Sequence, residues 1–166
     1  GAQSLSSDLG KIFSINKKTK KKVILSIGHD NPQGIIYDKV NNVIFSTEHG
    51  PQGGDELNIN INVDNKITNF GYPISSYGEH YKKNYSDRIL NEAPLNKSHK
   101  KFGFVEPIKY FDPSIGISQI ISLNQEDTEF LIGAMGNEIK EQDLGLHYIK
   151  LNKDQKSSDL IVSDLV

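Results

Sequence analysis

The chain contains no cysteine and no tryptophan, and Arg88 is the only arginine among its 19 lysines and arginines. The absence of cysteine excludes disulfides, thiol nucleophiles and cysteine-ligated metals. Because bidentate clamps for phosphate or carboxylate normally use arginine, the chain is short of such groups. Its net charge of −2 provides no strong field for nucleic acid or an anionic membrane, so neither is expected as a partner.

Long apolar runs are also missing. No run approaches the roughly 18 residues that a membrane helix needs, so no membrane span is expected. The first residues, GAQSLSSDLG, have neither the basic nor the apolar region of a signal peptide. A length of 166 residues is typical of one domain. We therefore expect residues 1–166 to form a single domain, which can be a piece of something longer.

Short runs rich in Ile, Val, Phe and Tyr recur between turn residues, a pattern typical of β-strands. Strands are predicted at about residues 11–15, 22–27, 34–38, 42–47, 56–62, 117–123, 129–134 and 145–151. The best helix candidate is GNEIKEQDL at 136–144, and residues 73–104 form a long polar stretch without a clear period. A loop of that length is usually functional or partly disordered. Many short strands and few helices indicate an all-β sandwich, barrel or propeller.

Several residues that could suggest function have a simpler structural interpretation. The lysine run at 17–22 is predicted to be a solvated hairpin tip, since no aromatic residues interleave with it. The aromatic pairs Tyr37/Phe45 and Tyr110/Phe111 are expected in the core. Among the histidines, structural roles bonded to loop backbone are expected for His29 and His49, and surface positions for His80, His99 and His147.

The loop GHDNPQG at 28–34 follows a predicted strand. Pro32 has no N–H and cannot sit in a central strand, so the strand is expected to end in a tight loop and the next to start at Gly34. The side chains of His29, Asp30, Asn31 and Gln33 then lie at a strand end, where sites are commonly built.

The loop EHGPQGGDELN at 48–58 repeats this design. Gly50-Pro51 and Gly53-Gly54 allow backbone carbonyls to point outward, and Asp55 and Glu56 add carboxylates. A hard cation such as Ca²⁺ accepts such oxygens. The alternative is that both loops only satisfy their own turns with Asp and Asn side chains. The GGDEL string nearly matches the GGDEF signature of diguanylate cyclases, but no metal-binding aspartate precedes it in the required context.

Together the two loops resemble the glucose/sorbosone dehydrogenase family, soluble aldose sugar dehydrogenases that use pyrroloquinoline quinone (PQQ). The family pattern is close to GHRNPQG followed by EHGPxGGDE. Collinear matches lie at GKIFSI (10–15), NFGYPISSYG (69–78), EPIKYFDPSIGIS (106–118) and EFLIGAM (129–135). The resemblance runs from about residue 8 to the end of the chain.

The resemblance implies an all-β fold, a segment of about two to three blades of a six-bladed β-propeller of antiparallel sheets. The family's N-terminal portion, with its general-base histidine, is expected to be missing, so no catalytic residue is assigned in this chain. Exposed edges of a partial propeller invite pairing between chains, so a homo-oligomer is expected. A periplasmic or secreted location is also implied.

The resemblance further implies PQQ and Ca²⁺ as cofactors and an aldose sugar as substrate. Gly50 and Pro51 match the residues whose main-chain oxygens bind the Ca²⁺ that holds PQQ. Asp30 stands where the family has an arginine on the quinone, and this acid repels the PQQ carboxylates. Gly136 stands where many members have a lysine or arginine. The implied cofactor-binding positions are Asp30, Asn31, Gly50, Pro51, Ser114 and Gly136.

Three functions remain open at this point. The first is a PQQ- and Ca²⁺-dependent sugar oxidoreductase, favoured by Asn31, Gly50, Pro51 and Ser114. The second is a propeller binding module that has lost the quinone site, favoured by Asp30, by Gly136 and by the scarcity of arginine. The third is a β-fragment without independent activity. A Ca²⁺ site is compatible with either of the first two, because backbone oxygens do not depend on the lost cations.

Overall fold

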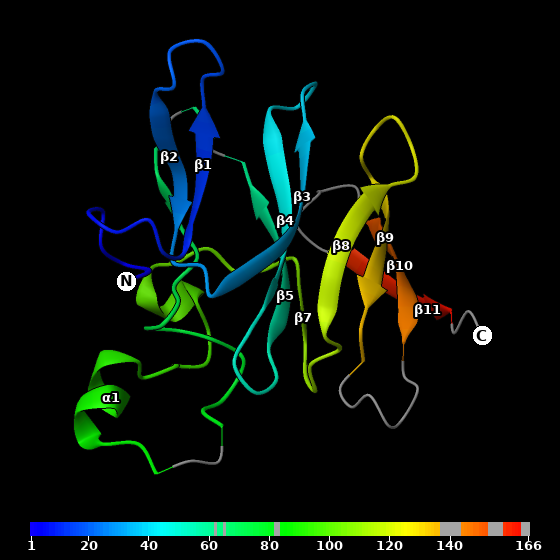
Figure 1. The fold of residues 1–166 in the computed structure, drawn as a ribbon. Coiled ribbons are helices and arrows are strands. Elements are labelled where there is room, and N and C mark those ends of the chain that lie inside the picture. Colours follow the sequence, from blue (N-terminus) through cyan, green and yellow to red (C-terminus); the bar gives the residue numbers. More distant parts are fainter. Residues whose placement is uncertain (62, 65, 82–83, 137–143, 153–157, 164–166) are drawn as a thin grey trace.

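The computed structural model describes residues 1–61, 63–64, 66–81, 84–136, 144–152 and 158–163. The described strands form three sheets, which lie side by side in chain order (Figure 1). The strands are β1 (Lys11–Ile15), β2 (Lys22–Ile27), β3 (Asn31–Asp38), β4 (Val43–His49), β5 (Asp55–Asn60), β6 (Thr68–Asn69), β7 (Lys109–Phe111), β8 (Ile117–Ser122), β9 (Glu129–Ala134), β10 (Gly145–Leu151) and β11 (Ser158–Ser163).

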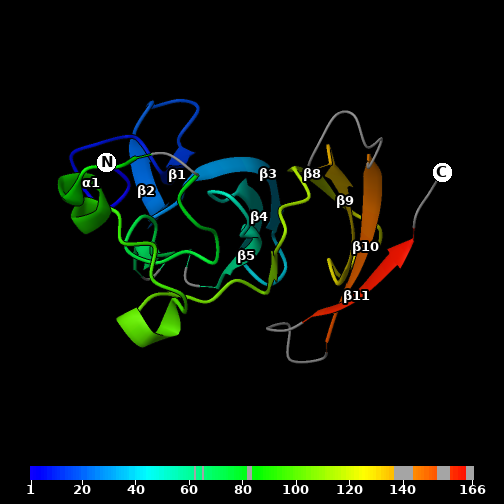
Figure 2. The ribbon, with the colours of Figure 1, turned by 90° about the horizontal axis from the view of Figure 1, so that it is seen from below.

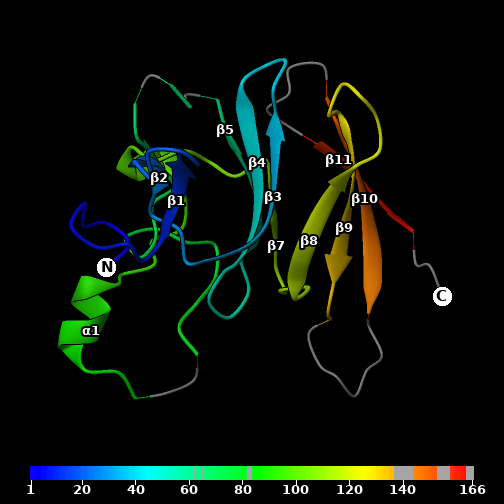
Figure 3. The ribbon, with the colours of Figure 1, turned by 45° about the horizontal axis from the view of Figure 1, so that its top comes forward.

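Two of the sheets are four-stranded antiparallel meanders, in the orders β3-β4-β5-β7 and β8-β9-β10-β11. The third has the order β1-β2-β6, in which β6 runs parallel to β2. Figures 2 and 3 show the sheets as successive units rather than as a closed barrel. Consecutive antiparallel sheets of this kind are the blades of a propeller. The predicted all-β propeller segment is confirmed, as two four-stranded blades and a three-stranded sheet.

Most predicted strands are present within two residues of their predicted ends, and those at 11–15, 22–27, 129–134 and 145–151 agree at both ends. The predicted start of β3 was wrong, because the strand begins at Asn31 rather than at Gly34 and includes Pro32. Since β3 is an edge strand with a register shift between Pro32 and Gly34, a residue without an N–H is tolerated there.

The long polar segment 73–104 contains α1 (Asp87–Glu92) and the 3₁₀-helix η1 (Lys100–Phe102), neither of which was predicted. Neither helix has a buried residue, so no apolar period marks them in the sequence. The short strands β6 and β7 and the strand β11 were also missed. The helix predicted at 136–144 falls largely on residues outside the described part of the chain.

The main apolar core lies between the two four-stranded blades. Its buried side chains come chiefly from β4 and β5 on one side and from β8, β9 and β10 on the other. The rings of Phe45 and Phe130 meet at its centre, with centroids 4.8 Å apart. Because apolar area removed from water is the dominant stabilising contribution, this core holds one blade against the next.

The prediction for the two aromatic pairs was half right. Phe45 and Phe111 are buried, but Tyr37 and Tyr110 are 50% and 44% exposed. Successive residues of a strand point to opposite faces, so Tyr110 cannot share the environment of Phe111. Its ring instead stacks on that of Tyr77, with centroids 3.9 Å apart.

The lysine-rich segment is the turn of the β1–β2 hairpin, as predicted. The backbone of Asn16 bonds to Lys20 and to Lys21 across the turn, and the lysines are exposed. Among the described residues no helix has the length and apolar content to cross a membrane.

Candidate functional site

The candidate site is a cavity of about 620 Å³ at the loop ends of the blades. This volume lies within the range of small-molecule sites. The positions implied by the family resemblance come from distant parts of the chain, yet all of them line this one cavity. They are Asp30, Asn31, Gly50, Pro51, Ser114 and Gly136.

The cavity has a second side that sequence reasoning missed. This side comes from the segment between β6 and β7, and it is mainly aromatic and apolar. Its lining residues are Tyr72, His80, Tyr81, Tyr85, Ile89, Ala93 and Leu95. The ring of His80 lies 4.9 Å from that of Tyr85, and its Nε2 lies 2.8 Å from the carbonyl oxygen of Ala93. The only signal in the sequence was the unusual length of the polar segment.

Asp55 ties the two blades together beneath the polar side. The Gly50 N–H donates to one carboxylate oxygen at 3.2 Å, and the N–H groups of Ile115 and Ile117 donate to the other at 3.2 and 2.9 Å. Asp55 is 1% exposed. Its oxygens are therefore engaged in holding the loop at 50–54 against the segment that carries Ser114, which argues against a role as a free cation ligand.

Two glycines make this packing possible. A Cβ on Gly50 would lie 2.2 Å from the carbonyl oxygen of Gly54, and a Cβ on Gly116 would lie 2.5 Å from that of Gly136. Gly116 also has a φ of +62°, which disfavours other residues. The N–H of Gly136 donates to the Ile115 carbonyl at 2.8 Å, so backbone contacts place Gly136 at the cavity.

Asp30 and Tyr72 form a polar pair in the cavity wall, where their side chains interact. Burial raises the pKa of Asp30 to about 6; the interaction with Tyr72 lowers it, and the nearby carboxylates Glu48 and Glu56 raise it further. Burial and the charge of Asp30 raise the pKa of Tyr72 to about 12. Near neutral pH, Asp30 is thus mainly charged and Tyr72 keeps its proton.

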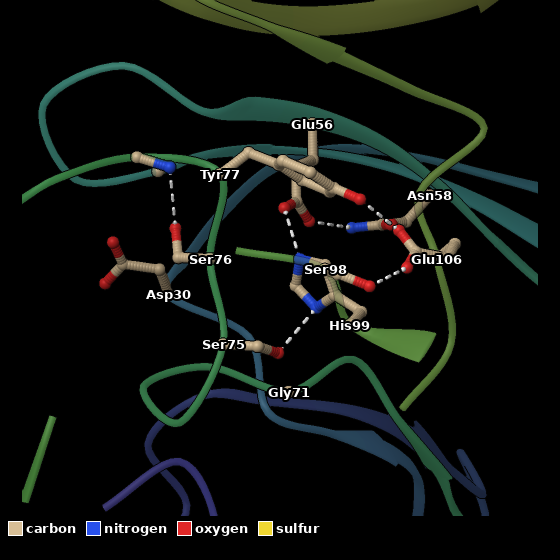
Figure 4. Close-up of polar contacts among 12 residues, drawn as sticks. Asp30, Glu56, Asn58, Gly71, Ser75, Ser76, Tyr77, Ser98, His99 and Glu106 are labelled. Atoms are coloured by element: carbon tan, nitrogen blue, oxygen red, sulfur yellow. Dashed lines mark hydrogen bonds and ion pairs between the residues drawn. The ribbon is translucent and has the colours of Figure 1, made fainter. Parts of the chain in front are cut away.

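Behind the cavity lies a buried polar network built around His99 (Figure 4). The His99 ring lies between the Ser75 hydroxyl, 2.9 Å from Nδ1, and the Glu56 carboxylate, 3.0 Å from Nε2. The Asn58 amide then donates to Glu56 at 3.1 Å and to Glu48 at 2.7 Å. His99 is 1% exposed, so its predicted surface position was wrong.

The network shifts the titration of its members. Burial is the largest influence on both Glu56 and His99, and it raises the pKa of Glu56. Burial alone would lower the pKa of His99, but the hydrogen bond and the charge of Glu56, together with Glu106, outweigh it and raise that pKa. The two groups therefore hold protons to higher pH than their free counterparts.

Of the other histidines, His29 belongs to the network, His49 and His80 line the cavity, and the His147 ring lies against that of Phe111. His29 is buried, as expected for a structural residue, but its partners are the side chains of Ser26, at 2.7 Å, and Glu48, at 3.2 Å, rather than loop backbone. His49 lines the cavity and its Nδ1 lies 3.8 Å from Asp55. His80 also lines the cavity and is half-buried, as is His147.

The described residues that line the cavity include acidic side chains that no lysine or arginine balances. Carboxylates, tyrosine and serine hydroxyls, an amide and imidazoles are present, but none of the described lining residues is a lysine or arginine. The described residues also contain no group of three or more His, Asp or Glu arranged to hold a metal ion. Such a wall suits an uncharged ligand rich in hydroxyl groups, with aromatic rings available for its apolar faces.

Comparisons with known proteins agree with the fold and with the loop patterns. Residues 1–160 match the family described as Glucose / Sorbosone dehydrogenase. The uncharacterized protein slr1608 of Synechocystis sp. is 31% identical over 136 residues, covering 74% of this chain and 30% of that protein. Aldose sugar dehydrogenase YliI of Escherichia coli is 29% identical over 150 residues, covering 87% of this chain and 36% of that protein.

Solved structures show the same fold. The soluble aldose sugar dehydrogenase of Escherichia coli in its apo form has a TM-score of 0.69 at 23% identity, covering 99% of this chain and 47% of that one. A glucose dehydrogenase has a TM-score of 0.61 at 26% identity, covering 90% of this chain and 40% of that one. The chain spans less than half the length of each of these relatives, and it belongs to the glucose/sorbosone dehydrogenase family.

Proposed function

We propose that this chain supplies one wall of a sugar-binding cavity in a glucose/sorbosone dehydrogenase-related protein. The observation that carries the proposal is the convergence of all six implied positions on one cavity of about 620 Å³. Its polar side offers hydrogen-bond donors and acceptors and its other side offers aromatic rings, which is the combination that a hydroxyl-rich, partly apolar ring requires. The aldose sugar dehydrogenase activity named for YliI supports a sugar as the ligand class.

A calcium ion fits the chemistry of this wall. Gly50 and Pro51 line the cavity, and the Asp30 carboxylate lies on the same wall. Ca²⁺ binds carbonyl and carboxylate oxygens, and the described lining offers oxygen donors but no competing cation. We propose that Gly50 and Pro51 would hold the ion, which would attract ligand hydroxyl oxygens there.

PQQ does not fit the described wall. The quinone carries carboxylates, while the described lining contributes the carboxylates of Asp30 and Asp55 and neither a lysine nor an arginine. Burying these like charges together without a lysine or arginine beside the quinone carboxylates is strongly unfavourable. The described residues therefore favour a non-catalytic sugar-binding module, and no oxidation step is assigned to them.

PQQ- and Ca²⁺-dependent oxidation of aldose sugars is the second candidate. The observation in its favour is that Asn31, Gly50, Pro51 and Ser114 share one cavity in the order that the family resemblance implies. Under this candidate the cations that face the quinone come from outside the described residues of this chain.

Calorimetric titration separates the two candidates. An aldose sugar and PQQ are each titrated into the purified protein, with and without Ca²⁺. Sugar binding that Ca²⁺ strengthens, without saturable PQQ binding, is the result expected for the binding module. Saturable, Ca²⁺-dependent PQQ binding would instead establish the oxidoreductase candidate. A folded protein that binds neither ligand would contradict both.

The proposal extends to the domain organisation, the location and the assembly of the chain. Residues 1–166 are proposed to be a single partial propeller domain, periplasmic or secreted as the family resemblance implies. The outermost strands of the sheets present unpaired backbone groups, which favours association between chains. Light scattering on the purified protein is expected to show a homo-oligomer, and a stable monomer would count against this proposal.

A further inference from the structure

The position of Asp30 sets the charge of the cavity wall. Asp30 lies between the end of β2 and the start of β3, where its N–H donates to the buried Glu48 carboxylate at 3.1 Å. This bond anchors the backbone of Asp30 at the wall. In Figure 4 the Asp30 carboxylate is turned away from the His99 network, which leaves its oxygens for Tyr72 and the cavity.

Tyr72 completes a site for hydroxyl groups. Its side chain interacts with that of Asp30, and both residues line the cavity. A tyrosine hydroxyl that donates to a carboxylate still has a lone pair that accepts a hydrogen bond, and the second carboxylate oxygen accepts another. The pair therefore presents acceptors to the cavity, which a hydroxyl group satisfies and a ligand anion does not.

The surroundings strengthen this preference. Two further carboxylates, Glu48 and Glu56, lie behind Asp30, and their negative charges raise its pKa. None of the described lining residues is a lysine or arginine. In a partly buried cavity such like charges interact more strongly than they do in water.

We propose that Asp30 is a specificity-determining residue that, together with Tyr72, binds neighbouring hydroxyl groups of an uncharged or cationic sugar, and that its charge rejects sugars and cofactors that carry a carboxylate at this position. The inference rests on the proposed function for its ligand class. It goes further in naming the residue that selects that class, the residue that helps to bind it, and in excluding anionic ligands.

Three sugars that share one ring test the selection: glucose, glucosamine and glucuronate. Affinities are measured by ligand-observed NMR at about pH 7.5, where Asp30 is mainly ionised. The wild type is expected to bind glucuronate at least about tenfold more weakly than glucose. Raising the ionic strength to about 0.5 M is expected to reduce this gap between the two affinities. Asp30→Asn is expected to reduce the gap between the affinities for glucose and glucuronate to about twofold or less.

Matched variants separate charge selection from general damage. Asp8→Asn makes the same charge change at an exposed residue that pairs with Lys22 outside the cavity, and it is expected to leave the gap unchanged. Tyr72→Phe removes one hydroxyl and is expected to weaken all three sugars by a similar factor. A glucose-to-glucuronate gap in Asp30→Asn equal to that of the wild type would overturn the inference.

A second measurement does not depend on sugar binding. Asp30→Arg is titrated with PQQ in the presence of Ca²⁺ beside the wild type, with circular dichroism to show that both are folded. Stronger PQQ binding by Asp30→Arg supports charge selection by this position, and equal binding contradicts it. Failure of the wild type to bind any of the three sugars overturns the proposed function, whatever the outcome of the PQQ titration.

Discussion

The central strands β4 and β5 of the blade β3-β4-β5-β7 are buried on both faces, and the two faces are built largely from opposite kinds of side chain. Toward the next blade it presents Phe45, Leu57 and Ile59, which belong to the apolar core. Toward the β1-β2-β6 side it presents Glu48, Glu56 and Asn58. Every residue of β5 is buried, so the alternation along this strand separates two environments rather than core from solvent.

The polar face places two like charges opposite each other. Glu48 and Glu56 are cross-strand partners on β4 and β5, an arrangement that is destabilising without compensation. The compensation comes from Asn58, whose amide donates to both carboxylates, and from His29 and His99, which each face one of them. The apolar face needs only matching volumes, whereas the polar face needs each partner in place.

The largest effect is expected on the apolar face. Phe130→Ala removes a fully buried ring that packs against Phe45, and we expect a loss of about 3–5 kcal/mol in the free energy of unfolding. Urea unfolding measures it at about pH 5 and pH 8. The loss in the free energy of unfolding should be the same at both pH values, because this substitution exposes no titrating group. A marked pH dependence of the loss would contradict the distinction between the apolar and the polar face. Phe130→Leu should cost about 1.5 kcal/mol or less.

On the polar face, His99→Ala is expected to cost about 3 kcal/mol, because it leaves the buried Glu56 without its partner. Burial already raises the folded-state pKa of Glu56. A raised acid pKa means that the folded state binds the proton more tightly, so stability falls as the pH rises through that pKa. The pKa of His99 is raised as well, so the contribution of His99 to stability is fully present at about pH 5, and urea unfolding at that pH measures the loss. His99→Gln keeps a hydrogen-bond donor for Glu56 and is the control. Equal losses of stability for His99→Ala and His99→Gln would contradict the role of His99 as the partner of Glu56.

Thr47 is a polar residue on the largely apolar face and sharpens the comparison. Its hydroxyl donates to the Ser118 carbonyl at 2.6 Å and accepts from the Gly34 N–H at 2.9 Å, joining the two blades. Thr47→Val keeps the shape but leaves two buried backbone groups unpaired, so a loss of about 1–3 kcal/mol is expected. Thermal unfolding should show Thr47→Ser much closer to the wild type, and a neutral Thr47→Val would indicate that water replaces the hydroxyl.

The smallest effect is expected at the cavity wall. Burial raises the pKa of Asp30 from 3.8 to about 6, so the folded state holds this proton more tightly and stability falls as the pH rises from about 4 to about 6. After allowance for partial exposure and screening, the contribution is about 1–2 kcal/mol. The stability of Asp30→Asn should not fall over this pH range, and the variant should be at least as stable as the wild type at about pH 7.5. If the stability of Asp30→Asn changes with pH in the same way as that of the wild type, the raised pKa of Asp30 is contradicted.

Much of the fold could be predicted because its signals are local. The runs around Phe13, Leu25 and Leu131 have the composition and turn boundaries of strands. Where local signals were weak or misleading, the prediction failed. Pro32 lies in a strand because that strand is an edge with a register shift, and nothing near Pro32 in the sequence says which strand will be an edge.

The sequence by itself determined the strand pattern, the two glycine-rich loops and, through them, the family. Only the tertiary structure decided that Tyr72 faces Asp30, that Asp55 is engaged by three backbone N–H groups, and that His99 is buried against Glu56. These partners are separated by many residues along the chain, and a local pattern carries no information on which distant groups meet. The cavity depends on those meetings, because blade packing sets its shape and charge.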